Sequence, residues 1–188
     1  MSSIFEKGRE VWGKVSGSLE SAMDQAQSEV GKLQTQAAGA PDASKARIWA
    51  KIGETQAKQE ADQEKLRSSL LDQIAEANTQ LSQLEGAAAG VSGSAREKLT
   101  RDIDQVREER DKALTKLTTN LESEIAAAEN EMATLQKEAA DASGGAAARI
   151  QVRAEWARIR RDTVQQWLQE VRTLQPVAAP VSSVPPIR

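Results

Sequence analysis

Apolar positions recur every three or four residues from Ile48 to Leu84, with polar residues between them. Repeated steps of 4, 3 and 4 residues give a period of 11, about 3.67 residues per turn, so the apolar stripe runs nearly straight along one helix face. The stripe positions are Ile48, Ile52, Thr55, Gln59, Gln63, Leu66, Leu70, Ile74, Ala77, Leu81 and Leu84. A second stripe lies 51 residues further on, at Leu99, Ile103, Val106, Arg110, Leu114, Leu117, Leu121, Ile125, Ala128, Met132 and Leu135. We therefore predict two long helices of one design.

The same 51-residue spacing reaches both ends of the chain. Upstream, a helix predicted over 3–37 carries five matching positions, Leu19, Met23, Ala26, Val30 and Leu33. Downstream, Ala148-Arg149-Ile150 repeats Ala46-Arg47-Ile48 at twice the spacing, so a fourth helix is predicted to begin near Ala146 and to end before Pro176. Short turns make neighbouring helices antiparallel, and one unit alone cannot bury its stripe. The predicted fold class is all-α, with four long helices from a helix–turn repeat and a central antiparallel helical hairpin.

Four segments follow from this pattern: an N-terminal amphipathic helix (1–41), a long antiparallel helical hairpin (42–143), a basic C-terminal helix (144–175) and a Pro-rich tail (176–188). The tail is predicted to be extended or disordered, because proline interrupts helices. The pattern leaves open whether the helices close into one bundle or the hairpin stands out as a rod.

Composition argues against a globular enzyme. Leu, Ile, Val and Phe together number 35 of 188 residues, and much of the remaining apolar content is alanine, so the cores are expected to be thin. Without histidine or cysteine there is no imidazole base, no Ser–His or Cys–His pair and no thiolate ligand. Two acidic clusters lie among basic residues and are interpreted as solvated helix faces: Glu108, Glu109 and Asp111, and Glu129 with Glu131. We expect no enzymatic activity, no cofactor and no metal.

No stretch approaches the ~18 apolar residues of a transmembrane span, and the N-terminus lacks the basic start and apolar block of a signal peptide. A cytoplasmic protein is expected, with peripheral membrane contact as an option. The charges are uneven: residues 93–143 carry 8 basic and 12 acidic groups, whereas residues 144–188 carry 7 basic and 3 acidic groups. The simplest interpretation is that the last helix docks against the acidic third helix, and the alternative is that it faces an anionic partner.

The N-terminal segment has the pattern of a helix that lies at an interface, with bulky apolar residues on one side and small or charged residues on the other. Its candidate contact residues for a membrane or other apolar surface are Ile4, Phe5, Val11, Trp12, Val15 and Leu19. The alternative is that the same side chains pack against the rest of the protein or against another subunit.

The last helix carries a second candidate surface, a charged and aromatic face made of Arg149, Arg153, Trp156, Arg160 and Trp167, which fall within about 60° of one another on a helical wheel. Cation–π contacts around Trp156 are plausible at this spacing. The face would pair with carboxylates of the third helix or of a neighbouring subunit, or with lipid headgroups. Nucleic acid is not expected, because the chain is acidic and has no groove-reading motif.

Polar residues interrupt the stripes of the hairpin at Gln59, Gln63 and Arg110. Such interruptions weaken a closed two-helix rod and suit lateral contacts with further chains, so a homo-oligomer or polymer is expected.

The layout of Ser3 to Leu19, the hairpin Ile48–Leu84 with Leu99–Leu135, and Ile150–Leu174 resembles the phage-shock-protein A branch of the ESCRT-III superfamily. The resemblance implies a self-assembling coat that reaches membranes through an N-terminal amphipathic helix. It is one of layout, without a diagnostic motif, and the near-equal repeats and long first helix depart from it. By composition the chain also resembles phasins, the alanine-rich coat proteins of polyester granules, which would make a granule surface the target. A coiled-coil adaptor or structural subunit that binds only protein is the alternative function.

Overall fold

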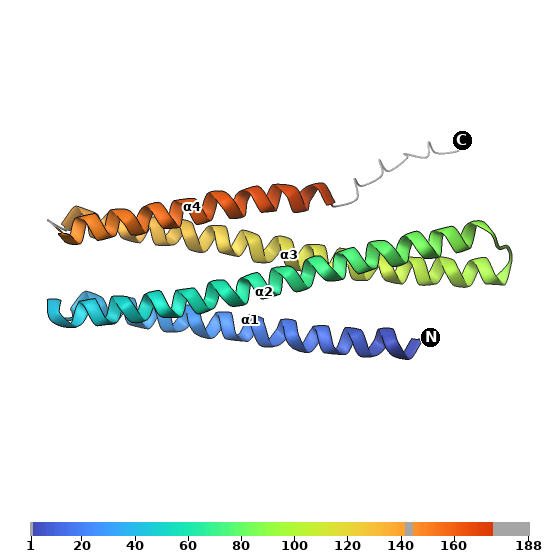
Figure 1. Cartoon of the computed structure of the whole chain (residues 1–188), viewed down its shortest axis with the longest axis horizontal. Helices are drawn as coiled ribbons and strands as arrows, with labels where there is room; N and C mark the ends of the chain where they lie inside the picture. The colour runs from blue at the N-terminus through green and yellow to red at the C-terminus, as the bar shows by residue number, and fades with distance from the viewer. Residues whose placement is uncertain (1, 142–144, 175–188) are drawn as a thin grey trace, which may run out of the picture. The chain divides into compact units, whose positions relative to one another are not determined.

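The computed structural model describes residues 2–141 and 145–174, and the side chains in these ranges except those of residues 2–13, 15, 16, 42, 43, 46, 141, 145 and 146. Within these ranges the elements are four helices: α1 (Ser2–Gly39), α2 (Asp42–Ala89), α3 (Ser94–Asp141) and α4 (Gly145–Leu174), shown in Figure 1. The described residues contain no strand, and the predicted all-α fold class is confirmed. The tail (176–188) lies outside the described residues.

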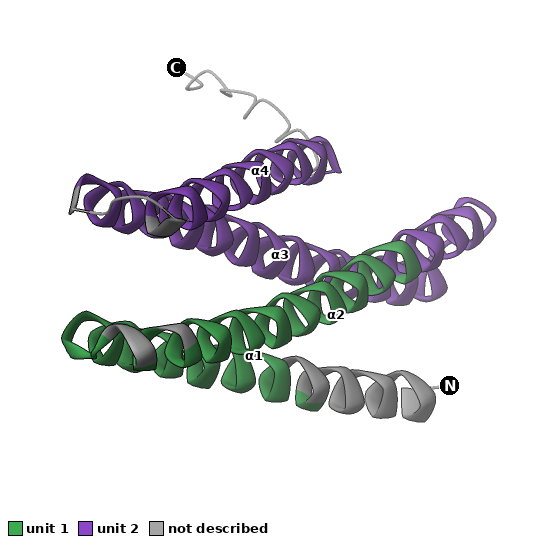
Figure 2. Ribbon diagram, turned by 60° about the vertical axis from the view of Figure 1, so that its left-hand side comes forward, with its two compact units in different colours: residues 1–76 green, residues 77–188 purple. Residues whose placement is uncertain are grey.

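The chain divides into two compact units, residues 1–76 and residues 77–188, coloured separately in Figure 2. In the first unit α1 runs antiparallel to the first part of α2, and an ion pair of 2.9 Å joins Glu29 to Lys51. The connection is short, because the carbonyl of Pro41 already accepts the first helical hydrogen bonds, from the N–H groups of Ser44 and Lys45.

In the second unit the end of α2 turns into α3 through residues 90–93, and α4 packs against α3. Gly93 has a φ of +63°, a conformation that a Cβ atom disfavours, and its carbonyl accepts the N–H of Glu97 at 3.2 Å to begin α3. The apolar stripe ends at Leu84, whereas α2 continues to Ala89. Three consecutive alanines, the strongest helix formers, account for the extra turn.

The predicted stripes are the buried faces of α2 and α3. All eleven positions from Ile48 to Leu84, and all eleven from Leu99 to Leu135, are buried or half-buried. Polar members find local partners: the Thr55 hydroxyl donates a hydrogen bond to the Lys51 carbonyl, and the Arg110 guanidinium donates to the Asp111 carboxylate at 2.9 Å. Of the polar stripe members, Thr55 and Arg110 are therefore satisfied within their own helices.

The stripe of α4 is also visible in the structure. Its buried side chains are Ala157, Val164, Leu168 and Val171, spaced by 7, 4 and 3 residues. Ala154, Ala157 and Leu168 occupy the positions of Ile52, Thr55 and Leu66 at twice the 51-residue spacing. Buried Val164 and Val171 fall outside the repeated positions, so the repeat continues only in part along the inner face of α4.

Candidate functional site

The first candidate surface is the N-terminal half of α1. The helix is continuous from Ser2 to Gly39, so it spans all six predicted contact residues. The side chains of five of them lie outside the described residues: Ile4, Phe5, Val11, Trp12 and Val15. The sixth, Leu19, is half-buried.

Helix geometry relates these positions to the packed part of α1. At about 100° per residue, positions 4 to 19 of the predicted set fall within roughly 120° of the helix circumference. Met23, Leu33 and Ala37, which are buried, fall within the same arc. The N-terminal apolar face is thus a continuation of the face that packs within the first unit. This alignment keeps both predicted roles open, surface contact and internal packing.

The second candidate surface is the charged and aromatic face of α4, and its side chains point in two directions. Arg153 and Arg160 both turn toward Glu131 of α3, which they reach at 3.1 and 3.4 Å. The Glu131 side chain is 13% exposed, so these contacts lie partly out of water. The predicted solvated face is therefore wrong for Glu131, because the arginines of α4 cover it, whereas Glu129 is exposed. A third pair, Arg172 with Glu122 at 3.1 Å, lies near the other end of α4. The docking of the basic last helix on the acidic third helix, indicated by the charge pattern, is confirmed.

Trp156 points away from that contact. It is 68% exposed, and it is flanked on the same side of α4 by Val152 and Ile159, which are 59% and 48% exposed. We call Val152, Trp156 and Ile159 the outer stripe. Of the other predicted residues, Arg149 is exposed and Trp167 is half-buried. The five predicted residues therefore do not form one surface, because two of them hold α4 to α3 while Trp156 belongs to the outer stripe.

The sequence prediction missed Val152 and Ile159 as surface residues. A signal for them exists in the repeat: 51 residues earlier, the three positions of the outer stripe hold Arg101, Gln105 and Glu108, all exposed in α3. Comparing α4 with the other copies position by position would have shown that apolar residues occupy a polar face.

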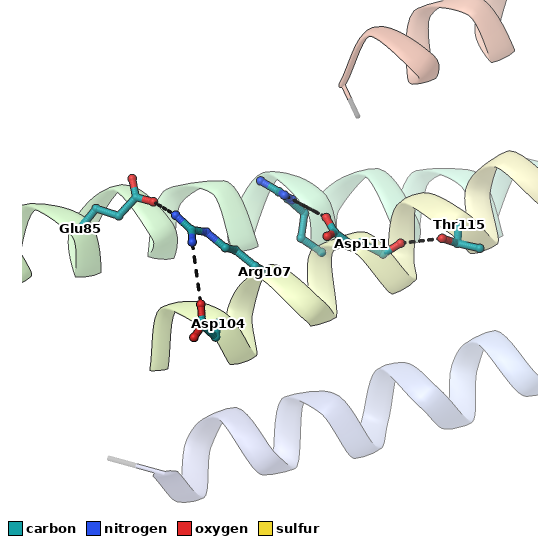
Figure 3. A network of polar contacts seen from close by, with 6 residues as sticks. Glu85, Asp104, Arg107, Asp111 and Thr115 are labelled. Atoms are coloured by element: carbon teal, nitrogen blue, oxygen red, sulfur yellow. Dashed lines mark hydrogen bonds and ion pairs between the residues drawn. The ribbon is translucent and has the colours of Figure 1, made fainter. Parts of the chain in front are cut away.

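A polar network covers the exposed side of α3 near its start. Arg107 reaches Glu85 of α2 at 2.8 Å and Asp104 at 3.8 Å, and the Thr115 hydroxyl donates a hydrogen bond to the carbonyl of Asp111 at 2.8 Å (Figure 3). A shallow, open hollow runs along these residues and is lined by acidic and basic side chains in nearly equal number. Its charges neutralise one another, so it offers no strong field for a charged ligand.

Two exposed carboxylates titrate below their ordinary range. A hydrogen bond from Lys112, at 2.6 Å, and its positive charge hold the pKa of Glu108 below 4.5. A hydrogen bond from Lys51 lowers the pKa of Glu29 in the same way. Among the described residues, no group of three or more acidic side chains is placed to hold a metal ion.

No protein family, curated protein or solved structure matches this chain. No helix in the described ranges combines the length and the apolar character required to cross a bilayer.

Proposed function

We propose that this protein is a non-enzymatic helical scaffold that assembles with copies of itself and associates with a membrane or other apolar surface through the start of α1. One observation supports it above the others. In α2 and α3 the two stripes hold most of the buried side chains, and long faces of these helices are exposed to solvent. The buried residues beside the stripes are Arg67, Ser69, Ala113 and Glu124. Slender helices of 48 residues, such as α2 and α3, present extended surfaces for contact with other molecules.

The surface-binding part of the proposal is supported by the arrangement of α1. Bulky apolar residues and a tryptophan share one arc with small and charged residues opposite, as in helices that insert shallowly into a bilayer. The segment has few basic residues, so insertion of apolar side chains would contribute more than attraction to anionic lipids. Under this proposal the protein is cytoplasmic and peripheral on its target surface.

The fluorescence of Trp12 tests the contact directly. In a variant with Trp49, Trp156 and Trp167 replaced by Phe, anionic lipid vesicles are expected to shift the Trp12 emission to the blue, because the ring enters the headgroup region. The matched control keeps Trp49 alone; this residue is half-buried in α2, and its emission should stay unchanged. Deleting residues 2–18 is expected to abolish co-sedimentation with the vesicles while the helix content of α2 and α3 persists.

A protein-only adaptor or structural subunit is the second candidate function. It is favoured by the shared arc of positions 4–19 and the buried Met23, Leu33 and Ala37, because the whole face could then be covered by protein. Unchanged Trp12 emission, together with the full chain remaining in the supernatant, would reject membrane contact and leave this candidate.

A further inference from the structure

At the outer stripe, α4 carries larger apolar side chains than the equivalent positions of α2 and α3. The equivalent positions in α3 hold Arg101, Gln105 and Glu108, and those in α2 hold Ala50, Glu54 and Ala57; all six are exposed. In α4 the same face carries Val152, Trp156 and Ile159, three exposed large apolar side chains; Leu174, at the end of the helix, is exposed as well. A face that is solvated in two copies and apolar in the third indicates a contact that only α4 makes.

The spacing of the outer stripe suits a second helix. Steps of 4 and 3 residues from Val152 to Trp156 to Ile159 are those of the core positions of a two-stranded coiled coil, with Val152 and Ile159 at d and Trp156 at a. On the helix circumference Trp156 lies about 100° from buried Ala157, about 80° from Val164 and about 60° from Val171, and Val152 and Ile159 lie further away. The three side chains are 48–68% exposed, so α3 does not cover them. A helix packed on the outer stripe would therefore not compete with α3.

The charges beside the stripe determine which helix fits. The next a position after Trp156 is Thr163, and the residue before each a position is acidic, Glu155 or Asp162. The residues after the d positions are basic, Arg153 and Arg160. Within their own helix Glu155 also pairs with Arg158 and Asp162 with Arg161. In a parallel pair of identical helices these two flanks face each other, and Glu155 of one copy comes near Arg160 of the other. In an antiparallel pair, acidic flank meets acidic flank and basic meets basic, which is repulsive.

We propose that the outer stripe is the contact through which α4 pairs in parallel with α4 of a second copy of this chain. The pair forms around Val152, Trp156 and Ile159 of both copies, with Glu155 facing Arg160 across the interface. Arg160 keeps its contact with Glu131 and adds a second carboxylate to its surroundings. The inference rests on the self-assembly in the proposed function and names the surface that carries it.

Disulfide trapping tests the arrangement, and the chain suits it because it contains no cysteine. In a parallel pair each d residue lies opposite itself, within reach of a disulfide. The single variants Val152→Cys and Ile159→Cys, both at exposed positions, are each expected to form disulfide-linked dimers roughly tenfold faster than a control under mild oxidation. The control is Gln151→Cys, which is exposed next to the stripe but points to another side of α4. Circular dichroism checks that all three variants keep the helix content of the wild type.

The outcomes separate this inference from the proposed function. Rapid trapping of both stripe variants supports the parallel pair. Rapid trapping of only one overturns it in favour of an antiparallel pair, in which identical residues meet only at the twofold axis.

If the wild type oligomerises in sedimentation equilibrium while the stripe variants and the control react equally slowly, assembly stands and the outer stripe is excluded. If the wild type stays monomeric at all concentrations, self-assembly fails as well. If no variant is trapped, and Trp156 emission shifts to the blue on vesicles, the stripe belongs to a lipid surface and the inference is overturned.

Discussion

Two glycines near the α2–α3 turn have opposite roles. Gly93 adopts a positive φ, which is unfavourable for residues that have a Cβ atom. Gly86 lies inside α2, with open space where a Cβ atom would be added. Gly93→Ala is expected to lower the free energy of unfolding by about 1–2 kcal/mol. Gly86→Ala is expected to raise it by roughly 0.5–1 kcal/mol, because alanine loses less backbone freedom in a helix. Chemical denaturation followed by circular dichroism measures both, and changes of equal sign would contradict the assignment of the turn.

The exposed carboxylate of Glu108 provides a second test at the level of one residue. Its pKa lies below 4.5 in the folded chain because Lys112 donates a hydrogen bond to it. A lowered folded-state pKa stabilises the protein above the unfolded pKa, and this contribution is lost as the pH falls through the folded value. Lys112→Gln is expected to return the Glu108 pKa toward 4.5, as measured by NMR titration of the side-chain carboxyl. An unchanged titration curve would show that Lys112 is not the cause.

At the level of elements, α4 is held to α3 by contacts of unequal strength. Glu131 receives two arginines in a partly buried place, whereas Glu122 and Arg172 are both more than half exposed. Glu131→Gln is expected to cost about 1.5–3 kcal/mol of stability, because hydrogen bonds to a charged group are lost. Glu122→Gln is the matched control and should cost less than about 1 kcal/mol, since exposed ion pairs contribute little. Equal losses in urea denaturation would place the two pairs in the same environment.

The sequence predicted the elements well where one pattern determined them. The 11-residue stripes identified the buried faces of α2 and α3, because a helix that packs along its length needs apolar residues at that spacing, and the charge asymmetry identified α3 as the partner of α4. The helix ends were less accurate: alanines that can continue a helix or enter a turn extended α2 to Ala89.

The outer stripe was not predicted for a physical reason. The helix α4 has apolar residues on two faces, and periodicity alone does not say which face a neighbour covers. Trp156 was grouped with Arg153 and Arg160 because they share an arc. Only the contact of both arginines with Glu131 shows that the arc straddles the edge of the interface between α3 and α4, with Trp156 beyond it.

At the level of the whole molecule, the chain lacks a side chain that ordinarily titrates near neutral pH. It contains no histidine and no cysteine. Its net charge of −3 is therefore expected to stay nearly constant between pH 6 and pH 8, and neither stability nor assembly should switch in that range. Melting temperatures at the two pH values should agree within about 2 °C. A larger difference would reveal a carboxylate or amine whose pKa has moved into this window.

The period of the stripes also limits how the length of such a protein can change. Eleven residues complete three helical turns with only about 20° left over, whereas nine residues would rotate everything beyond the insertion by about 180°. An insertion of eleven residues in one helix, matched by eleven in its antiparallel neighbour, would keep every apolar position in place. The helix lengths of related or designed versions of this protein should therefore differ in steps of about 16 Å, the rise of eleven helical residues. The period of the apolar stripe thus sets the smallest change in length that keeps the buried faces of the helices intact.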